Sequence, residues 1–312
     1  MLCGKNWIVD GGLGSSLQAA GYPIEKDPLW SARMLQDNPQ AIKEVHMSFL
    51  EAGANVLITN SYQASIPSFA KHLSITENET LTLITQSVII AKETIEEFRN
   101  KNPSEKDTQF LVAGSVGPYG ACQADGSEYN GSYIQNISKE ELQEWHRPRI
   151  AALVGAGVDL LAVETIPAAA EALAVLELLK EFPDTKVWCT FSCKNGHATN
   201  FGDDFKVAVK LCYELSGAQL VGIGINCTAP HFITSLLTGA NNTLPSPNEL
   251  PRVVYPNSGE SWKSGQGWEG RPTNLEWIKN LKEWTDLGAT VIGGCCRVTT
   301  HDIKDIANHM SN

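Results

Sequence analysis

The sequence lacks the long apolar segments that mark membrane and exported proteins. Nowhere do about 18 apolar residues run together, as a membrane-spanning helix requires. Residues 1–6 contain no basic segment followed by an apolar core, so no secretion signal is predicted. We therefore expect a cytoplasmic protein with no membrane partner.

Positive charge is also in short supply. The 312 residues include 24 Lys and Arg against 35 Asp and Glu, and no basic stripe with interleaved aromatic residues occurs. Nucleic acid is therefore excluded as a partner on electrostatic grounds. An acidic chain of this kind favours a cationic or zwitterionic small molecule as its substrate.

Histidine supplies no recognisable metal motif. The seven histidines include neither an HExxH pattern nor another paired ligand spacing. His231 follows soon after Cys227, and an exposed loop position is the expected one for it. Metal ligands must therefore be sought among other residue types.

Cysteine is present in a pattern that does not fit disulfides. The eight cysteines are dilute in a chain of this length, so reduced thiols are expected. Cys227 ends the run GINC at 224–227, and Cys295 and Cys296 end the run GGCC at 293–296. A trans peptide holds adjacent Cα atoms only about 3.8 Å apart, below the disulfide range of roughly 4.4–6.8 Å. A vicinal pair plus one distant thiol favours a catalytic zinc, which has three protein ligands and a fourth position for substrate.

The cysteines allow two other interpretations. All three could be buried small hydrophobic side chains, but their regular placement argues against this. Cys189 and Cys193 are four apart on one predicted strand and so share a face. They are either alternative ligands or core residues, and the core role is favoured.

Short apolar runs alternate with helical segments eight times along the chain. Such near-continuous apolar runs predict strands buried on both faces, as in a parallel sheet. Eight βα units in series predict a (β/α)8 TIM barrel, a single domain over residues 1–312, with a doubly wound open sheet as the alternative. The predicted strands are residues 7–12, 55–61, 109–117, 159–165, 186–193, 220–227, 252–258 and 289–296.

Capping residues locate several of the helices. Asn38 before Pro39 predicts a helix start, and Thr76 and Ser138 each begin the capping-box pattern with a Glu three residues later. Pro148 should kink or divide the helix that contains it. Further helices are expected near 168–182, 203–216, 229–238, 273–287 and 300–310, and looser stretches at 118–137, 240–250 and 258–272.

Polar residues at other strand ends face the same barrel mouth as the thiols, because active sites form where barrel strands end. Asp10 with Gly11 and Gly12 ends the first predicted strand. Their amides could bind a carboxylate or phosphate, although such a segment is equally often only a turn.

Glu164 ends the fourth predicted strand, in a run that is otherwise apolar. A carboxylate in such surroundings needs a partner, because burying an isolated charge is very costly. That partner is either a substrate ammonium group or a nearby arginine, Arg147 or Arg149.

With these residues in hand, the chain resembles the homocysteine S-methyltransferase family. That family carries DG(G/A), GxNC and GGCC after strands one, six and eight of its barrel, and the likeness is closest to its bacterial branch that uses S-methylmethionine. Further matching segments are LWSA at 29–32, SYQA at 61–64, AGSVGPYGA at 113–121, DGSEY at 125–129, HRPR at 146–149 and VYPNSGE at 254–260.

The resemblance implies particular roles. Three cysteines would hold Zn²⁺, amides near the first strand would hold the homocysteine carboxylate, and a glutamate would hold its amino group. No catalytic residue beyond the zinc site is implied. The implied zinc ligands are Cys227, Cys295 and Cys296, and the implied substrate-binding residues are Asp10, Gly11, Gly12 and Glu164.

The implied reaction is methyl transfer from a sulfonium donor, S-methylmethionine or S-adenosylmethionine, to the thiolate of L-homocysteine. A neutral thioether departs, so no general acid is needed, which fits the lack of an evident catalytic histidine. Trp30, Tyr62, Tyr119 and Tyr129 are candidates to face the sulfonium by cation–π contact.

Two alternative functions remain. One is a homocysteine methyltransferase that uses betaine or a methylfolate. Betaine-type relatives carry a C-terminal extension and cobalamin-dependent ones carry extra domains, whereas this chain stops after the eighth predicted helix. We therefore expect a sulfonium donor and a monomer. The other alternative is a non-catalytic zinc-binding or redox-sensing protein, which would leave the polar strand ends unexplained.

Overall fold

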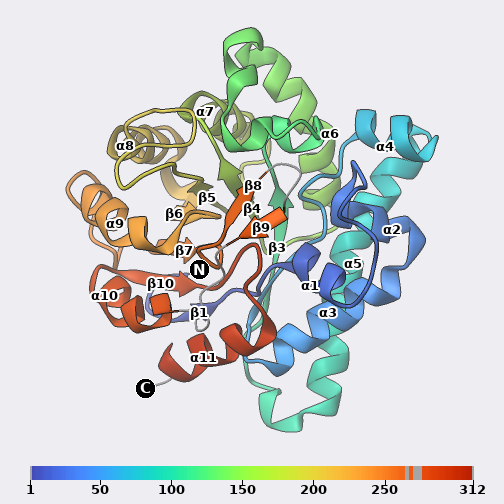
Figure 1. Cartoon of the computed structure of the whole chain (residues 1–312), viewed down its shortest axis with the longest axis horizontal. Helices are drawn as coiled ribbons and strands as arrows, with labels where there is room; N and C mark the ends of the chain where they lie inside the picture. The colour runs from blue at the N-terminus through green and yellow to red at the C-terminus, as the bar shows by residue number, and fades with distance from the viewer. Residues whose placement is uncertain (1, 264–266, 270–275, 311–312) are drawn as a thin grey trace.

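Eight parallel strands form a closed barrel in the computed structural model, which describes residues 2–263, 267–269 and 276–310 (Figure 1). The strand order is β1-β10-β7-β6-β5-β4-β3-β2, with every neighbouring pair parallel. A parallel bridge between Val9 and Val56 joins the two ends of this order and closes the ring. The (β/α)8 barrel is thus confirmed, and the open sheet is excluded.

All eight predicted strands exist, but several end earlier than predicted. The barrel strands are β1 (Trp7–Ile8), β2 (Val56–Ile58), β3 (Leu111–Val116), β4 (Leu160–Ile166), β5 (Val187–Phe191), β6 (Leu220–Asn226), β7 (Arg252–Tyr255) and β10 (Ala289–Ile292). Short strands β8 (Ser261–Lys263) and β9 (Gly267–Glu269) pair antiparallel, inside a stretch predicted to be irregular. The segments that leave the barrel early are those that carry the polar motifs.

Helices surround the barrel (Figure 1). They are α1 (Leu13–Ala19), α2 (Met34–Asp37), α3 (Pro39–Glu51), α4 (Ile66–Leu73), α5 (Glu77–Lys101), α6 (Lys139–Gly155), α7 (Ala169–Leu178), α8 (Phe205–Ser216), α9 (Ile233–Asn241), α10 (Leu281–Asp286) and α11 (Thr300–Met310). The first part of the helix predicted at 273–287 lies outside the described residues. No helix of the described part of the chain combines the length and apolarity needed to cross a membrane.

The predicted helix caps are confirmed. The Asn38 side chain accepts a hydrogen bond from Ala41 N at the start of α3, and Thr76 and Ser138 both form complete capping boxes. Pro148 does not divide α6, which continues from Lys139 to Gly155. A proline removes one helical hydrogen bond, and the buried face of α6 holds the helix together across that position.

The barrel interior changes from apolar to polar along the strands. Alternate residues of a strand share a face, so the inward series on β4 is Leu160, Ala162 and Glu164, all buried. The lower positions belong to an apolar cluster that also contains Trp7 and Trp188. The barrel therefore has a packed apolar floor beneath a polar layer at its carboxyl-terminal mouth.

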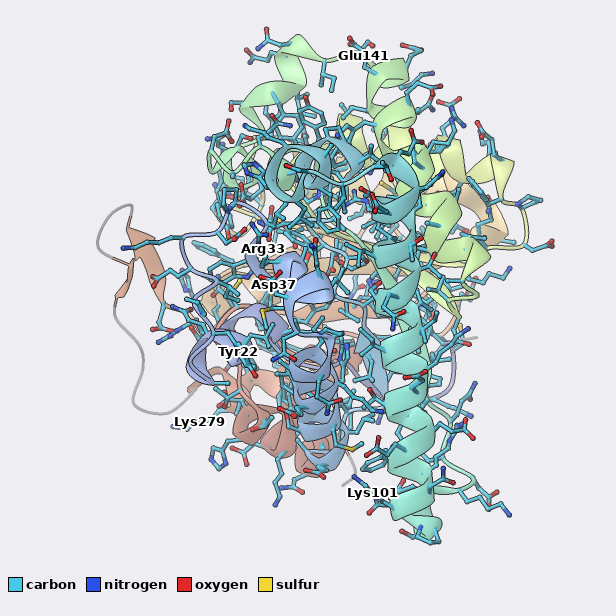
Figure 2. All side chains as sticks on the ribbon, turned by 90° about the vertical axis from the view of Figure 1, so that its right-hand side faces the viewer. Tyr22, Arg33, Asp37, Lys101, Glu141 and Lys279 are labelled. Atoms are coloured by element: carbon cyan, nitrogen blue, oxygen red, sulfur yellow. The ribbon has the colours of Figure 1, made fainter. Side chains whose placement is uncertain are left out.

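A segment between α1 and α3 lies over this mouth beside the long helix α5 (Figure 2). Arg33 Nε donates to Asp27 Oδ2 at 2.8 Å, and Asp27 Oδ1 accepts from the backbone N–H of Leu29. These bonds tie the two sides of Trp30 together. The segment thereby fixes the position of an aromatic side chain at the mouth.

We predict that Gly224→Ala destabilises the barrel by about 3 kcal/mol, because an added methyl group has no room there. A Cβ at Gly224 would lie 1.9 Å from the Val253 carbonyl oxygen on β7. The matched control is Gly155→Ala at the end of α6, where a Cβ would meet nothing within 4 Å. Urea unfolding measures both variants, and equal stabilities would contradict this account of the β6–β7 packing.

Candidate active site

Three thiols converge at the barrel mouth, as predicted. Cys227 directly follows β6, while Cys295 and Cys296 follow the end of β10. Their sulfur atoms all lie within 4.8 Å of one another, and this is the one such metal-binding group among the described residues. The Sγ atoms of Cys227 and Cys296 are 3.7 Å apart, far beyond the roughly 2.05 Å of a disulfide bond. The thiols are free and placed to hold one metal ion.

Ionising these thiols without a cation is unfavourable. Hydrogen bonding to Cys227 and Cys296, followed by burial, raises the pKa of the Cys295 thiol well above its usual value. Three thiolates at this spacing would repel one another strongly in a site of low dielectric constant. A bound cation is the direct way to offset that repulsion, since metal-coordinating thiols are deprotonated.

Two glycines allow the vicinal cysteines to reach the mouth. A Cβ at Gly293 would lie 2.5 Å from the Val9 carbonyl oxygen, and one at Gly294 would lie 2.1 Å from Val298 Cγ1. Neither position tolerates a side chain without local movement. The close backbone approach carries Cys295 beyond the barrel ladder, as the paired glycines predict.

Asn226 fixes the backbone immediately before Cys227, at the end of β6. Its Oδ1 accepts from Thr165 N at 2.7 Å and from Thr190 Oγ1 at 2.8 Å, so it joins the ends of β4, β5 and β6. Cys227 then turns into the mouth with φ of 45°, a conformation that costs energy for a residue with a side chain. Asn226 thus keeps the thiol in a strained position.

Arg297 secures the vicinal pair. Its Nε and Nη2 donate to the two carboxylate oxygens of Glu260 at 3.0 and 3.2 Å. Its backbone N–H also donates to Ser15 Oγ at 3.0 Å. A bidentate pair of this kind is directional, so the residue after Cys296 is held from two sides.

Glu164 lies in the polar layer, where Ser115 Oγ donates to its Oε1. Burial raises the pKa of Glu164 to about 7. Among the described residues, neither predicted arginine bonds to this carboxylate: Arg147 pairs with Glu144 and Glu181, and Arg149 donates to two backbone carbonyls. Burial outweighs the hydrogen bonds from Ser115 and Tyr255 and the Arg149 charge, all of which lower the pKa of Glu164.

Asp10 is buried at the mouth, and its Oδ2 accepts from Ile58 N at 3.0 Å. Burial raises its pKa well above the usual range. His46 Nδ1 lies 3.9 Å from the same oxygen, and burial lowers the pKa of this histidine to about 4. The imidazole is therefore neutral at physiological pH, and Asp10 has no buried cation beside it.

Of the two glycines after Asp10, Gly12 differs from the expectation of a free amide. Gly12 N donates to the Val298 carbonyl oxygen at 3.1 Å, so this amide is already used within the protein. A Cβ at Gly11 would lie 2.6 Å from the same oxygen, which shows how closely the two segments pack. Gly12 therefore shapes the wall beside the thiols rather than offering a free donor.

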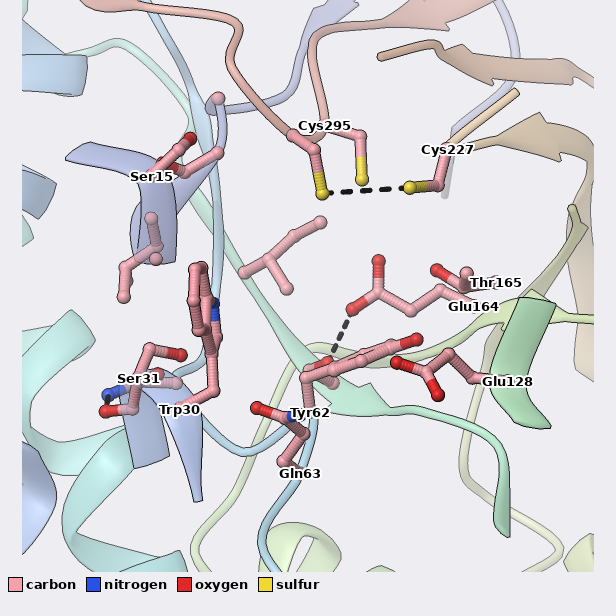
Figure 3. Close-up of a pocket in the computed structure, with 18 of the residues that line it drawn as sticks. Ser15, Trp30, Ser31, Tyr62, Gln63, Glu128, Glu164, Thr165, Cys227 and Cys295 are labelled. Atoms are coloured by element: carbon pink, nitrogen blue, oxygen red, sulfur yellow. Dashed lines mark hydrogen bonds between the residues drawn. The ribbon is translucent and has the colours of Figure 1, made fainter. Parts of the chain in front are cut away.

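One cavity of about 780 Å³ is lined by the three thiols together with Asp10 and Glu164 (Figure 3). Six acidic side chains and one lysine stand among the residues lining it, so the cavity favours cations. The lining includes the acids Asp10, Glu25, Asp27, Asp125, Glu128 and Glu164, and the base Lys26.

Three of the four candidate aromatic residues line the cavity, namely Trp30, Tyr62 and Tyr129. Tyr119 does not line it: its ring packs 5.1 Å from Trp145 and 5.3 Å from the ring of Tyr133, measured between centroids. The suggestion that Tyr119 faces a sulfonium is therefore wrong, because the local packing turns its ring toward α6.

Backbone strain is concentrated around the same cavity. Trp30 has φ of 47°, and its indole lies so close to Gly14 that a Cβ there would stand 2.0 Å from Nε1. Strained residues persist where the surrounding structure over-determines them, typically at functional sites. Non-glycine residues with positive φ that line the cavity are Trp30, Ala124, Thr165 and Cys227.

Sequence reasoning assigned no individual role to several residues of the site. Ser115, Thr190 and Tyr255 form the polar layer with Glu164, and Thr190 is the one of these three that lies outside the matching segments. Cys189 and Cys193 are buried core residues, as favoured. Glu128 entered only through the matching segment at 125–129, because it lies in the irregular stretch after β3.

The fold and the site define a (β/α)8 barrel whose strand ends bring three thiols and buried carboxylates into one acidic cavity. The family model for homocysteine S-methyltransferase matches residues 7–310. The chain belongs to the homocysteine S-methyltransferase family, whose members are methyltransferase enzymes.

Individual relatives agree with this assignment over nearly the whole chain. Homocysteine S-methyltransferase YbgG of Bacillus subtilis is 40% identical over 96% of this chain and 93% of its own length. Betaine-homocysteine S-methyltransferase of Drosophila melanogaster is 41% identical over 95% of this chain and 92% of its own. The metallated form of homocysteine methyltransferase MmuM from Escherichia coli superposes with a TM-score of 0.85 at 38% identity, covering 98% and 97% of the two chains.

We predict that Glu164→Gln stabilises the folded chain above neutral pH. Burial raises the pKa of Glu164 from 4.5 to about 7, so between these values the folded chain keeps a proton that the unfolded chain releases. Stability from this group therefore falls as the pH rises through that window. The variant removes this cost, which amounts to up to about 3 kcal/mol at pH 8.

Urea unfolding at pH 5 and pH 8 measures the effect. The stability advantage of Glu164→Gln should be small at pH 5 and large at pH 8. A variant that is less stable than the wild type at pH 8 would contradict the assignment of a buried carboxylate without a bonded cation.

Proposed function

We propose that this protein transfers a methyl group from S-methylmethionine to the thiolate of L-homocysteine, with Zn²⁺ held by Cys227, Cys295 and Cys296. The observation that carries the proposal is the convergence of three thiols and a buried carboxylate, Glu164, that forms no ion pair with a described residue, in one acidic cavity. An amino acid that also bears a thiol matches both features.

The thiols fit zinc in particular. In a tetrahedral site with Zn–S bonds of about 2.3 Å, sulfur atoms stand about 3.8 Å apart. The 3.7 Å between Cys227 and Cys296 Sγ agrees with that spacing. Three protein ligands are typical of catalytic zinc, whose fourth position takes water or substrate. When bound, zinc lowers the pKa of a coordinated thiol, so that the thiolate is available at neutral pH.

The protein's own groups hold the acceptor. Glu164 binds the homocysteine ammonium group, which supplies the cation that the buried carboxylate lacks. Asp10 lines the same cavity, and the segment of Gly11 and Gly12 forms the wall beside the thiols. Holding the acceptor at both its sulfur and its amino group fixes the direction of attack.

The transfer step needs little further chemistry. A new C–S bond forms between the homocysteine thiolate and the methyl carbon, while the methyl–sulfonium bond breaks. The bonding electron pair stays on the departing sulfur, which leaves as the neutral thioether of methionine. The thiol proton passes to solvent. Trp30 and Tyr62 line the cavity and can stabilise the cationic donor through their ring faces.

The cavity charge supports a sulfonium donor over betaine. S-methylmethionine carries an ammonium, a sulfonium and a carboxylate, for a net charge of one positive unit, whereas betaine is neutral overall. A cavity lined by six acids and one lysine attracts the net cation more strongly. S-adenosylmethionine has the same charged groups and extends this proposal to a second donor.

Betaine is the second candidate donor. The observation that favours it is the relative from Drosophila melanogaster named betaine-homocysteine S-methyltransferase, at 41% identity. Since relatives at similar identity are named only homocysteine S-methyltransferase, identity alone does not decide the donor.

A donor panel distinguishes these candidates. Purified protein supplied with zinc and homocysteine should form methionine with S-methylmethionine, more slowly with S-adenosylmethionine, and at least tenfold more slowly with betaine. Methionine formation is measured by chromatography at matched donor concentrations.

Faster methionine formation with betaine than with S-methylmethionine would make betaine the methyl donor. No transfer from any member of the panel would instead favour the non-catalytic zinc or redox interpretation. A variant with Cys227→Ala serves as the inactive control, because it removes one of the proposed ligands.

A further inference from the structure

Glu128 is a carboxylate of the cavity that the mechanism above does not use. It lies in the segment between β3 and α6 and lines the same cavity as the thiols. Figure 3 shows its carboxylate beside Tyr62, on the same side of the cavity as Glu164. Its Oε2 atom is buried and has no hydrogen-bond partner within the described part of the chain. A buried acceptor of this kind is costly unless a ligand satisfies it.

The segment that carries Glu128 is held in place by hydrogen bonds near both of its ends. Tyr119 N near its start donates to Glu171 Oε1 at 2.6 Å, and Tyr133 near its end donates its hydroxyl proton to Glu171 Oε2. Glu171 is itself buried and bonded to His146 Nε2 at 2.9 Å. One buried carboxylate therefore pins both ends of the segment to the body of the barrel.

Inside the segment, the backbone packs tightly around Glu128. A Cβ at Gly120 would lie 2.6 Å from Glu128 N, and Asp125 Oδ1 accepts from Ser127 N at 2.8 Å. These contacts leave little freedom for the position of the Glu128 backbone. The Glu128 carboxylate, whose Oε2 has no partner within the described part of the chain, is therefore held in the cavity by the packing of its own segment.

Two amino-acid substrates bring two α-ammonium groups into the cavity, so a second carboxylate is needed to bind the second one. Homocysteine and S-methylmethionine each carry an α-ammonium group, and Glu164 can serve only one of them at close range. Burial raises the pKa of Glu128 to about 7, and a bound ammonium would favour its ionised form. Lys26 is the one basic side chain among the residues lining the cavity, and Asp27 and Glu25 adjoin it in sequence.

We propose that Glu128 binds the α-ammonium group of the methyl donor and so selects amino-acid sulfonium donors. This inference rests on the proposed S-methylmethionine activity and adds to it a residue that determines donor specificity. Betaine has no N–H group to donate to Glu128, so binding it would leave the carboxylate unsatisfied. Sites built to bind a polar group reject analogues that lack it.

The test compares Glu128→Gln with the wild type on two donors. One is S-methyl-L-methionine, and the other is its des-amino analogue, (3-carboxypropyl)dimethylsulfonium, which keeps the sulfonium and carboxylate but lacks the ammonium group. A lost charge-assisted hydrogen bond corresponds to a factor of about 10 to 100. Glu128→Gln should raise the KM for S-methylmethionine by that factor and change kcat little.

The KM of the variant for the des-amino analogue and for homocysteine should stay within twofold of the wild-type values. Glu128→Asp should recover part of the affinity for S-methylmethionine, because it restores the charge. Glu140→Gln, which removes an exposed charge on α6, is the matched control and should match the wild type on both donors.

Equal losses on both donors, or no loss on either, would overturn the role of Glu128. Failure of the proposed function itself would look different, since the wild type would then use betaine and not S-methylmethionine. In that case both the proposed S-methylmethionine activity and the proposed role of Glu128 are wrong. A wild type that uses S-methylmethionine with an unchanged Glu128→Gln variant overturns this inference alone.

Discussion

The crowding of three sulfur atoms within 4.8 Å is the constraint on which the rest of the site depends. Hydrogen bonds to its neighbours and burial raise the pKa of the Cys295 thiol, and three thiolates at this spacing would repel one another, so a bound cation is the direct way to hold all three in the ionised form. Reaching it requires strain elsewhere: Cys227 adopts a left-handed conformation, and Gly293 and Gly294 pass too close to neighbouring atoms for any side chain. Two hydrogen bonds between Asn226 and Thr165, one accepted and one donated by the Asn226 side chain, hold this geometry in place.

Along the barrel axis, the residues that stabilise the fold lie at one end and the residues of the site lie at the other. Apolar residues fill the floor, and the inward positions near the mouth change to polar groups that belong to the site. The polar layer costs stability, since Glu164 is buried with a raised pKa. A ligand with an ammonium group offsets that cost. Two buried carboxylates without a bonded cation among the described residues, Glu164 and Glu128, are the basis for proposing a site that binds two ammonium-bearing amino acids.

The sequence predicts the parts that local pattern controls. Period and capping residues identify all eight strands and the starts of α3, α5 and α6. Motifs at strand ends identify the thiols and Glu164. Contacts between distant segments are beyond such reasoning: it does not show that Gly12 N bonds to Val298, that His46 lies beside Asp10, or that Glu171 pins the segment carrying Glu128. Strand ends were overestimated because the polar motifs that follow the apolar runs were counted as strand, although the ladder hydrogen bonds stop before them.

The central claim is that the sulfur of homocysteine joins the three cysteine thiolates on one zinc ion. X-ray absorption at the zinc edge counts the sulfur ligands directly, on the zinc-loaded protein with and without saturating L-homocysteine. The account predicts three sulfur ligands and one lighter atom without homocysteine, and four sulfur ligands with it. A sulfur count that stays at three when homocysteine is bound would contradict the account, because the thiols would then hold a metal that the acceptor never meets.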